Sequence, residues 1–253
     1  MAVHYETDDP VAIVTLDRPE SANAIDRPTA DELVAALRRF EADESLSVAV
    51  LTGAHGKFCA GADLKAMREE GAPRASRVAP DGDGPVGPTR MMLAKPVIAA
   101  VEGHAVAGGL ELAAWCDMRV AAEDAVFGVY CRRWGIPLMD GGTIRLTRLL
   151  GHSHALDLIL TGRGVSGEEA LRMGLANRLV APGDALPAAV ALAKDMASRP
   201  QAALRSDRLS SYEQWSLPLD DALVCEYEHG MATLQTGELF EGLEDYASGG
   251  WRG

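Results

Sequence analysis

The sequence predicts an α/β fold that continues into a helical C-terminal part. Apolar runs rich in Val and Ile alternate with stretches of helical periodicity as far as about Ala181. Beyond that residue every segment has a helical pattern. No long linker separates the two parts. We therefore expect a core over residues 1–195 and a helical assembly region over residues 196–253 that is not an independent domain.

The expected elements follow in order along the chain. Residues 3–8 and 11–16 have strand patterns separated by the turn signal Asp9-Pro10, which predicts a hairpin. The further expected strands cover residues 48–52, 96–101, 119–122, 125–127 and 179–180. The expected helices cover residues 28–41, 112–115, 143–150, 154–160, 185–198, 201–215 and 219–236. Another helix is expected to begin at Ser166, which is a natural N-cap before Glu169.

The composition narrows the functional class. The chain has 253 residues, of which 47% are apolar and 24% charged, as is usual for a soluble globular protein. The net charge of −13 argues against a nucleic-acid partner, which requires a basic surface. No apolar run reaches the about 20 residues of a membrane span. The N-terminal segment lacks the basic and apolar regions of a signal peptide, so we expect a cytoplasmic protein without a membrane partner.

Signals for metal ions and disulfides are weak. His152 and His154 lie close together, but no third ligand is evident, so no metal site is predicted. The cysteines are far apart and form no Cys-x-x-Cys pair, which argues against a zinc ribbon and a disulfide framework. They are Cys59, Cys116, Cys131 and Cys225.

The stretch from Ala105 to Leu112 is the strongest candidate for a functional site. A predicted strand leads into Gly108-Gly109, and a helix follows. This arrangement presents free backbone N–H groups to an anion or a polarised carbonyl, and the glycines leave room for its approach. Glu111 follows within the first turn, so a carboxylate stands beside those donors. The alternative is a glycine-rich turn with an exposed glutamate that favours the helix N-terminus.

A second corner of the same kind covers residues 56–67, where a loop becomes a helix near Asp63. The polar segment 69–89 after it is dense in Gly, Pro, Asp and Arg, and we expect a mobile surface loop that could act as a lid. Residues 82–87 match the glycine pattern of dinucleotide-binding loops. We reject that match because the segment follows no strand, opens no helix and contains a proline.

The two corners together resemble the crotonase superfamily, the enoyl-CoA hydratase/isomerase family. The resemblance runs from about Val11 to Pro200 in the family's order and approximate spacing. The matching stretches are Gly56–Leu64; Gly103–Ala113 with Cys116-Asp117; Phe127-Gly128 with Gly141–Leu146; and Leu160–Gly162 with Glu169-Ala170 and Gly174–Ala176. The resemblance implies a spiral of repeated ββα units with a C-terminal helical region, usually assembled as a trimer or a dimer of trimers. It also implies an acyl-CoA thioester as ligand.

By resemblance, the backbone N–H groups of Ala60 and Gly108 form an oxyanion hole for the thioester carbonyl. No cofactor or metal is implied, because acyl-CoA is the substrate. The residues implied to bind the CoA part of the substrate are Ala62, Asp63, Leu64 and Gly109.

The sequence departs from the hydratase pattern at the second catalytic glutamate. Glu111 matches the first glutamate, whereas Cys131 stands at the second position. A thiol does not replace a carboxylate as base without a lowered pKa, so Cys131 is either a small buried filler or a nucleophile. Asp140 is a candidate replacement acid, and its alternative role is an N-cap of the helix that follows. Arg132 and Arg133 are either contacts for CoA phosphates or surface charges.

These observations predict an acyl-CoA enzyme that stabilises a thioester enolate, with hydration of 2-enoyl-CoA as the expected reaction. The same-fold alternatives are an isomerase or an acyl-CoA hydrolase that uses Glu111 with Asp140. The alternative from another class is a non-catalytic acyl-CoA-binding protein. The C-terminal helices carry an apolar stripe that we expect an assembly to cover. Its members are Leu217, Leu219, Leu223, Val224, Tyr227, Met231 and Leu234.

Overall fold

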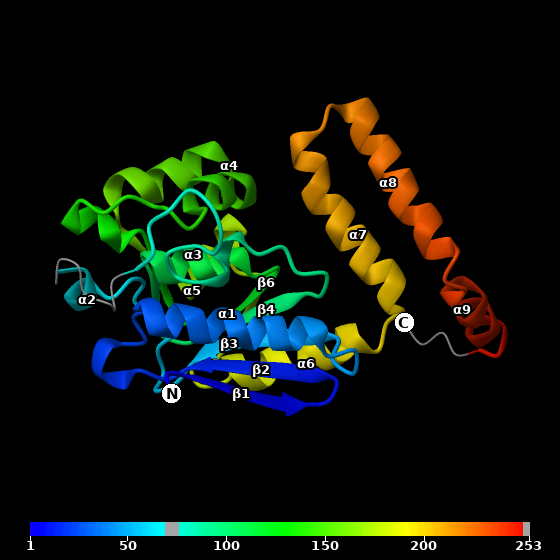
Figure 1. Ribbon diagram of the computed structural model, residues 1–253, viewed down its shortest axis with the longest axis horizontal. Helices are drawn as coiled ribbons and strands as arrows, with labels where there is room; N and C mark the ends of the chain where they lie inside the picture. Colours follow the sequence, from blue (N-terminus) through cyan, green and yellow to red (C-terminus); the bar gives the residue numbers. More distant parts are fainter. Residues whose placement is uncertain (69–75, 250–253) are drawn as a thin grey trace.

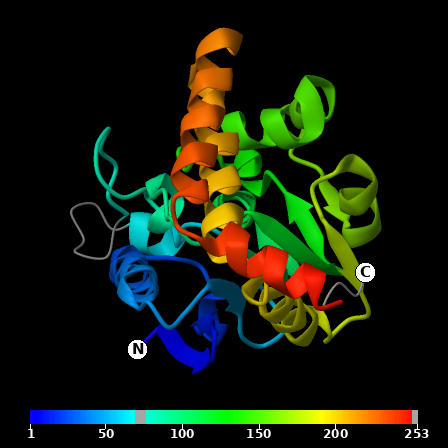
Figure 2. The same cartoon turned by 90° about the vertical axis from the view of Figure 1, so that its right-hand side faces the viewer.

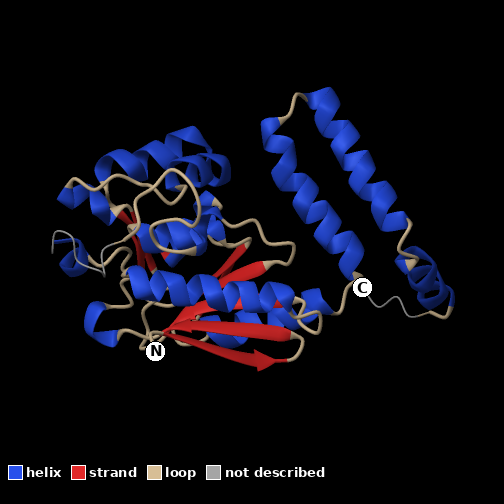
Figure 3. Ribbon diagram, in the orientation of Figure 1, coloured by secondary structure: helices blue, strands red, loops and turns tan. Residues whose placement is uncertain are grey.

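The computed structural model describes residues 1–68 and 76–249 and is built on a six-stranded sheet (Figures 1 and 3). The strand order is β1-β2-β3-β4-β6-β9. Strands β1 and β2 form the expected antiparallel hairpin, and the other neighbours pair in parallel. The strands are β1 (Val3–Asp8), β2 (Val11–Leu16), β3 (Val48–Gly53), β4 (Val97–Val101), β6 (Met118–Ala122) and β9 (Arg178–Val180).

The central strands β3 and β4 are buried on both faces, because they are apolar along almost their whole length. In β3, Ala49 and Leu51 pack on the side of α1 (Arg27–Ala42), whereas Val48 and Val50 pack against α6 (Ala185–Ala197). The fully buried α6 residues in that contact are Ala185, Ala189 and Ala193, which let the helix lie close to the sheet. Because successive side chains of a strand point to opposite faces, the sheet contributes to two separate cores, one on each face.

A second, three-stranded sheet has the order β5-β7-β8 and lies next to the corner at Gly108. Its strands are β5 (His104–Val106), β7 (Val126–Gly128) and β8 (Gly164–Ser166). The helices between the strands are α2 (Leu64–Arg68), α3 (Gly108–Trp115), α4 (Gly142–Thr161) and α5 (Gly167–Met173). Short 3-10 helices cover η1 (Pro19–Ser21), η2 (Pro88–Arg90), η3 (Tyr130–Trp134) and η4 (Gln214–Ser216).

The expected alternation of strands and helices, followed by helices alone, is confirmed, with local differences. Helix α3 begins at Gly108 instead of residue 112, because the Ala107 carbonyl already accepts from the Leu110 and Glu111 N–H groups. The helices expected at 143–150 and 154–160 form the one element α4, which is kinked at Gly151 where φ is 74°. Strands β5 and β8 were not predicted from the sequence. Part of the expected lid, residues 69–75, lies outside the described residues.

The C-terminal helices project from the α/β part as a hairpin of α7 (Gln201–Glu213) and α8 (Leu219–Leu234) (Figures 1 and 2). The hairpin is followed by α9 (Glu238–Ala247), which lies in the expected helical region but was given no bounds from the sequence. The C-terminal half of α7 is tied to the core through Asp117. Its carboxylate Oδ1 accepts from Arg208 Nε at 2.7 Å and from the Tyr212 hydroxyl at 2.8 Å. No helix among the described residues is long and apolar enough to cross a membrane.

The hairpin and α9 leave many apolar side chains exposed, as the stripe in the sequence suggested. Contiguous exposed apolar faces mark sites of interaction with another protein, a membrane or a ligand. The exposed residues are Leu217, Leu219, Leu223, Val224, Tyr227, Met231, Leu234, Leu239, Phe240, Leu243 and Tyr246. The division at residue 195 and the assembly role of the C-terminal region stay predictions.

Deleting the chain from Asp220 onward is expected to give monomeric or aggregated, inactive protein, because the deletion removes the apolar face while leaving α7 without its neighbour. Size-exclusion chromatography with light scattering measures the mass. As a point test, Tyr227→Glu should reduce the mass, whereas its polar neighbour Glu226→Gln should not. A well-folded, active, monomeric truncation would show that the region is not needed for assembly.

Candidate active site

A cavity opens where the two strand–loop–helix corners meet. Its walls come from the loop after β3, from residues 76–86, from the start of α3 and from the segment between β7 and α4. The lining residues are mostly apolar, with two carboxylates and one thiol among them. They are Ala60, Ala62, Leu64, Met67, Ser76, Val78, Pro85, Val86, Ala107, Gly108, Glu111, Tyr130, Cys131, Trp134, Ile136, Pro137, Met139 and Asp140.

Two backbone N–H groups point into this cavity region from neighbouring corners. Ala62 forms a parallel bridge with Ile25, in which the flanking Gly61 carbonyl and Asp63 N–H make the hydrogen bonds. The N–H of Ala62 itself therefore points to the opposite side. A Cβ built on Gly108 would lie 3.5 Å from the Ala62 nitrogen, so the two amides are adjacent. Neither N–H has a hydrogen-bond acceptor within the described part of the chain.

Ala60 does not supply the second donor, contrary to the expectation. Its N–H donates to the Ala22 carbonyl at 3.1 Å, although the residue does line the cavity. The register of the corner against Ile25 decides this, since it turns the Ala62 amide toward Gly108. The prediction of Gly108 as a donor is compatible with this geometry, and the unpaired amide next to Gly108 is that of Ala62 instead of Ala60.

Glu111 is buried, with 3% of its surface exposed, beside these amides. Its Oε1 accepts from the backbone N–H of Asp140 at 2.9 Å and of Gly142 at 2.8 Å. No partner for Oε2 occurs within residues 1–68 and 76–249, so this oxygen is available to a ligand. Burial, assisted by the nearby charge of Asp140, raises the pKa of Glu111 to about 7. A carboxyl with this pKa can both accept and donate a proton near neutrality.

Asp140 is a second buried carboxyl in the same cavity. Its Oδ1 accepts from the Thr89 hydroxyl at 2.5 Å and from the Val86 N–H at 3.1 Å. Burial raises the pKa of Asp140 despite these bonds. The N-cap of α4 is Gly141, and no side chain caps that helix. The alternative role of Asp140 as a helix cap is therefore wrong.

Cys131 lies in the cavity wall, where burial and the charge of Glu111 raise the pKa of its thiol. A raised pKa keeps the thiol neutral and unreactive, which favours the filler over the nucleophile. The neighbouring Arg132 donates to the Ile159 carbonyl at 3.1 Å, and the Arg133 guanidinium lies 3.8 Å from the centre of the Tyr130 ring. Trp134 stands at the cavity with 68% of its surface exposed. The sequence reasoning gave no role to these two aromatic residues.

The expected CoA-binding residues divide into two groups. Ala62 and Leu64 line the cavity, whereas Asp63 and Gly109 do not. The Asp63 carboxylate pairs with Arg18 at 3.0 Å and accepts from the Lys65 N–H at the start of α2. A Cβ on Gly109 would lie 2.1 Å from the Cys59 carbonyl oxygen, so this glycine permits close packing of the two corners. Arg18, which fixes the second corner, was not singled out in the sequence because its partner is distant in the chain.

Comparisons of the chain with known proteins identify its family. A model of the enoyl-CoA hydratase/isomerase family matches residues 6–249. The chain belongs to this family. The chain is 35% identical over 246 residues to enoyl-CoA hydratase EchA19 of Mycobacterium tuberculosis, covering 93% of this chain and 89% of the relative. It is 36% identical over 227 residues to the short-chain-enoyl-CoA hydratase of Clostridium acetobutylicum, covering 89% of this chain and 87% of the relative.

The fold of the family is also observed directly. The crystal structure of enoyl-CoA hydratase EchA1 from Mycobacterium marinum superposes with a TM-score of 0.91 at 36% identity, covering 98% of this chain and 96% of that one. The expected crotonase fold is therefore confirmed. A carnitinyl-CoA dehydratase of Proteus mirabilis is 41% identical over 199 residues, covering 78% of this chain and 75% of the relative. Relatives of this family thus carry names for more than one reaction on CoA thioesters.

The raised pKa of Glu111 predicts a dependence of folding stability on pH. The carboxyl has a folded-state pKa of about 7 against 4.5 for the free group. The native state therefore holds the proton more tightly, so this contribution is present below about pH 4.5 and is lost as the pH rises through about 7. Over this window the free energy of unfolding of Glu111→Gln should fall less than that of the native protein, by up to about 3 kcal/mol.

Chemical denaturation at several pH values measures this difference. Cys131→Ala serves as the control, because it alters the same cavity without removing a carboxyl, and its pH dependence should follow that of the native protein. Parallel curves for Glu111→Gln and the native protein would show that the Glu111 pKa is not raised.

Proposed function

We propose that the protein hydrates 2-enoyl-CoA thioesters. The observation that carries this proposal is the Glu111 carboxyl beside the unpaired N–H groups of Ala62 and Gly108 in one cavity. Two preorganised donors stabilise the negative charge that grows on a thioester oxygen, and the loss of one such donor costs about 3 kcal/mol in other enzymes. The relatives named as enoyl-CoA hydratases support the same reaction.

In this mechanism the Ala62 and Gly108 amides hold the thioester carbonyl and polarise the conjugated double bond. Ionised Glu111 takes a proton from a water molecule through Oε2 while the water oxygen attacks C3. The electron pair of the double bond moves onto the carbonyl oxygen as an enolate. Protonated Glu111 then returns the proton to C2, which gives the 3-hydroxyacyl thioester. A single carboxyl with a pKa near the working pH suffices for both steps, and no cofactor is needed.

The second candidate is an isomerase in which Asp140 shares the proton transfer. This candidate is supported by Asp140, which lines the cavity and whose backbone N–H donates to Glu111. In addition, Cys131 stands at the position where the hydratase pattern has its second glutamate. An isomerase would remove a proton from one carbon with one carboxyl and return it to another carbon with either. A hydrolase or a non-catalytic binder has no observation of its own in its favour.

The proposal also covers the localisation and the oligomeric state of the protein. We propose a cytoplasmic homotrimer or dimer of trimers in which the exposed faces of α8 and α9 are covered. The large exposed apolar area of those helices supports an assembly.

Glu111→Gln is expected to lower kcat for hydration of crotonyl-CoA by about 10²–10⁴-fold with little change in KM. The amide keeps an oxygen for the Asp140 and Gly142 N–H groups but cannot transfer the proton. Loss of the enoyl absorbance measures hydration. Near-native turnover by this variant would contradict the proposed base.

Asp140→Asn separates the two candidates. Under hydration by Glu111 alone this variant should retain most of its kcat, whereas it should lose a factor comparable to Glu111→Gln if Asp140 is a second acid. Cys131→Ala is the matched control in the same cavity and should have a small effect. In deuterated water an isomerase exchanges deuterium into its substrate without loss of the enoyl group. A non-catalytic binder neither exchanges deuterium nor removes the enoyl group, whereas CoA esters still raise its Tm.

A further inference from the structure

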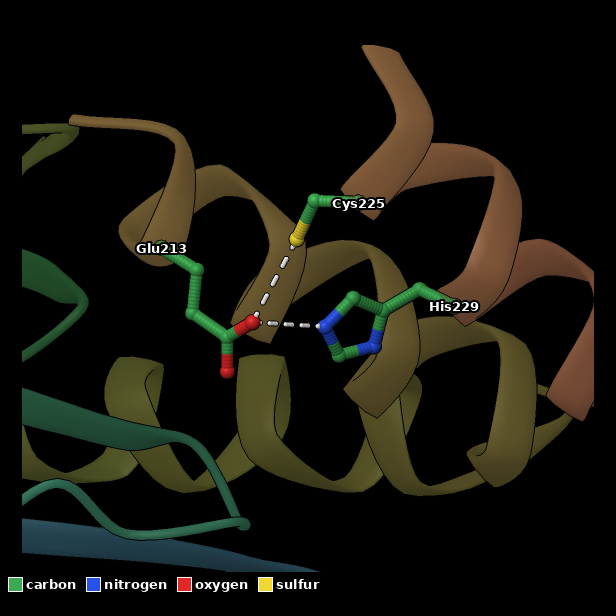
Figure 4. A group of neighbouring side chains, drawn as sticks. All are labelled: Glu213, Cys225 and His229. Atoms are coloured by element: carbon green, nitrogen blue, oxygen red, sulfur yellow. Dashed lines mark hydrogen bonds and ion pairs between the residues drawn. The ribbon is translucent and has the colours of Figure 1, made fainter. Parts of the chain in front are cut away.

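A cluster of Glu213, Cys225 and His229 lies on the C-terminal hairpin, and none of the three residues lines the cavity described above (Figure 4). Glu213 ends α7, whereas Cys225 and His229 stand four residues apart on α8. Glu213 Oε2 lies 2.9 Å from His229 Nε2 and 3.4 Å from Cys225 Sγ. All three ligand-type atoms lie within 4.8 Å of one another.

These separations are close to those of a tetrahedral zinc site. With ordinary bond lengths of Zn²⁺ to thiolate, imidazole and carboxylate, the sulfur–oxygen separation is about 3.5 Å and the nitrogen–oxygen separation about 3.3 Å. The observed sulfur–oxygen distance of 3.4 Å already agrees. The distance between His229 Nε2 and Glu213 Oε2 must increase by a few tenths of an ångström, because coordination to the ion replaces the hydrogen bond between them. The side chains of both Glu213 and His229 are partly exposed, which leaves them room to adjust.

We propose that Glu213, Cys225 and His229 bind a Zn²⁺ ion that clamps α7 to α8. A thiolate, an imidazole and a carboxylate are the ligand types that Zn²⁺ takes, and water fills the fourth position. On binding, the Cys225 thiol gives its proton to solvent, the neutral His229 ring uses its Nε2 lone pair, and the Glu213 carboxylate enters unchanged. The ion keeps its oxidation state, so no oxidant or reductant takes part.

The placement of the ligands on the helices supports a clamp. Residues four apart share one face of a helix, so Cys225 and His229 both turn toward Glu213 on α7. At about 100° per residue, the exposed apolar residues Leu223 and Tyr227 fall on the opposite face of α8. The ion therefore sits between the two helices and leaves the apolar face free.

This site was not foreseen from the sequence, which led us to predict no metal. The signal was Cys225 and His229 at a helical spacing of four, but the third ligand comes from another helix. The proposal is independent of the hydratase proposal, because no step of the hydration uses these residues.

Equilibrium dialysis of the full-length, metal-free protein with Zn²⁺ alone tests the site, and Co²⁺ serves as a spectroscopic probe. We expect one Zn²⁺ per chain, a thiolate-to-cobalt charge-transfer band and the visible bands of tetrahedral Co²⁺. Cys225→Ser should abolish the charge-transfer band. His229→Gln and Glu213→Gln should each weaken Zn²⁺ binding by about 100-fold or more, since loss of an outer partner alone costs 10–100-fold.

The control is the double variant His4→Gln/His55→Gln. These histidines bind opposite oxygens of Asp17, each at 3.0 Å, and lie on the α/β part, away from the C-terminal hairpin. This variant should bind Zn²⁺ as the native protein does. Circular dichroism and crotonyl-CoA hydration of each variant show that it is folded. Native-like Zn²⁺ binding by folded Cys225→Ser, or the absence of Zn²⁺ binding by the native protein, would overturn the proposal.

Discussion

The site depends on the hydrogen bonds that the Glu111 carboxylate accepts from the Asp140 and Gly142 amides. These bonds join the first turn of α3 to the segment that enters α4, two parts of the chain about thirty residues apart. They fix Oε1 and leave Oε2 for chemistry, so one interaction both orients the base and brings Asp140 into the cavity. Gly142 permits this contact, because a Cβ there would lie 2.8 Å from Glu111 Cγ.

The proposed backbone donors, the Ala62 and Gly108 amides, also require the two strand–loop–helix corners to lie close together. A Cβ on Gly61 would lie 2.7 Å from the Gly108 nitrogen, and one on Gly109 would overlap the Cys59 carbonyl. Bulkier residues would push the corners apart and separate the Ala62 and Gly108 amides. The low aromatic content of 5% fits this design, since close contact of backbone, more than large side chains, shapes the site.

Local patterns were sufficient to predict most strands and helices and to single out the Gly108 corner and Glu111, because each depends on residues close together in the chain. They were insufficient for the second donor. Ala60 and Ala62 are equally small, and only the bridge of Ala62 to Ile25 decides which amide faces Gly108. The ion pair of Asp63 with Arg18 was not foreseen for the same reason, since Arg18 is far away in sequence. For Asp140, two roles remained open until the capping geometry of α4 was known.

The C-terminal hairpin has two faces with different physical demands. One face of α8 is apolar and exposed in a single chain, which is costly in water unless another surface covers it. The other face carries Cys225 and His229 and turns toward α7 (Figure 4). A covering surface must recognise a hairpin of fixed geometry, which the Ser206 hydroxyl of α7 helps to fix by donating to the His229 carbonyl of α8 at 2.9 Å. An ion held by Glu213, Cys225 and His229 would join the two helices further. Another chain that covers the apolar outer face of α8 and an ion on its inner face are therefore compatible, because they use different faces of the helix. An ion on the inner face would hold the two helices together beforehand and so reduce the ordering that assembly requires.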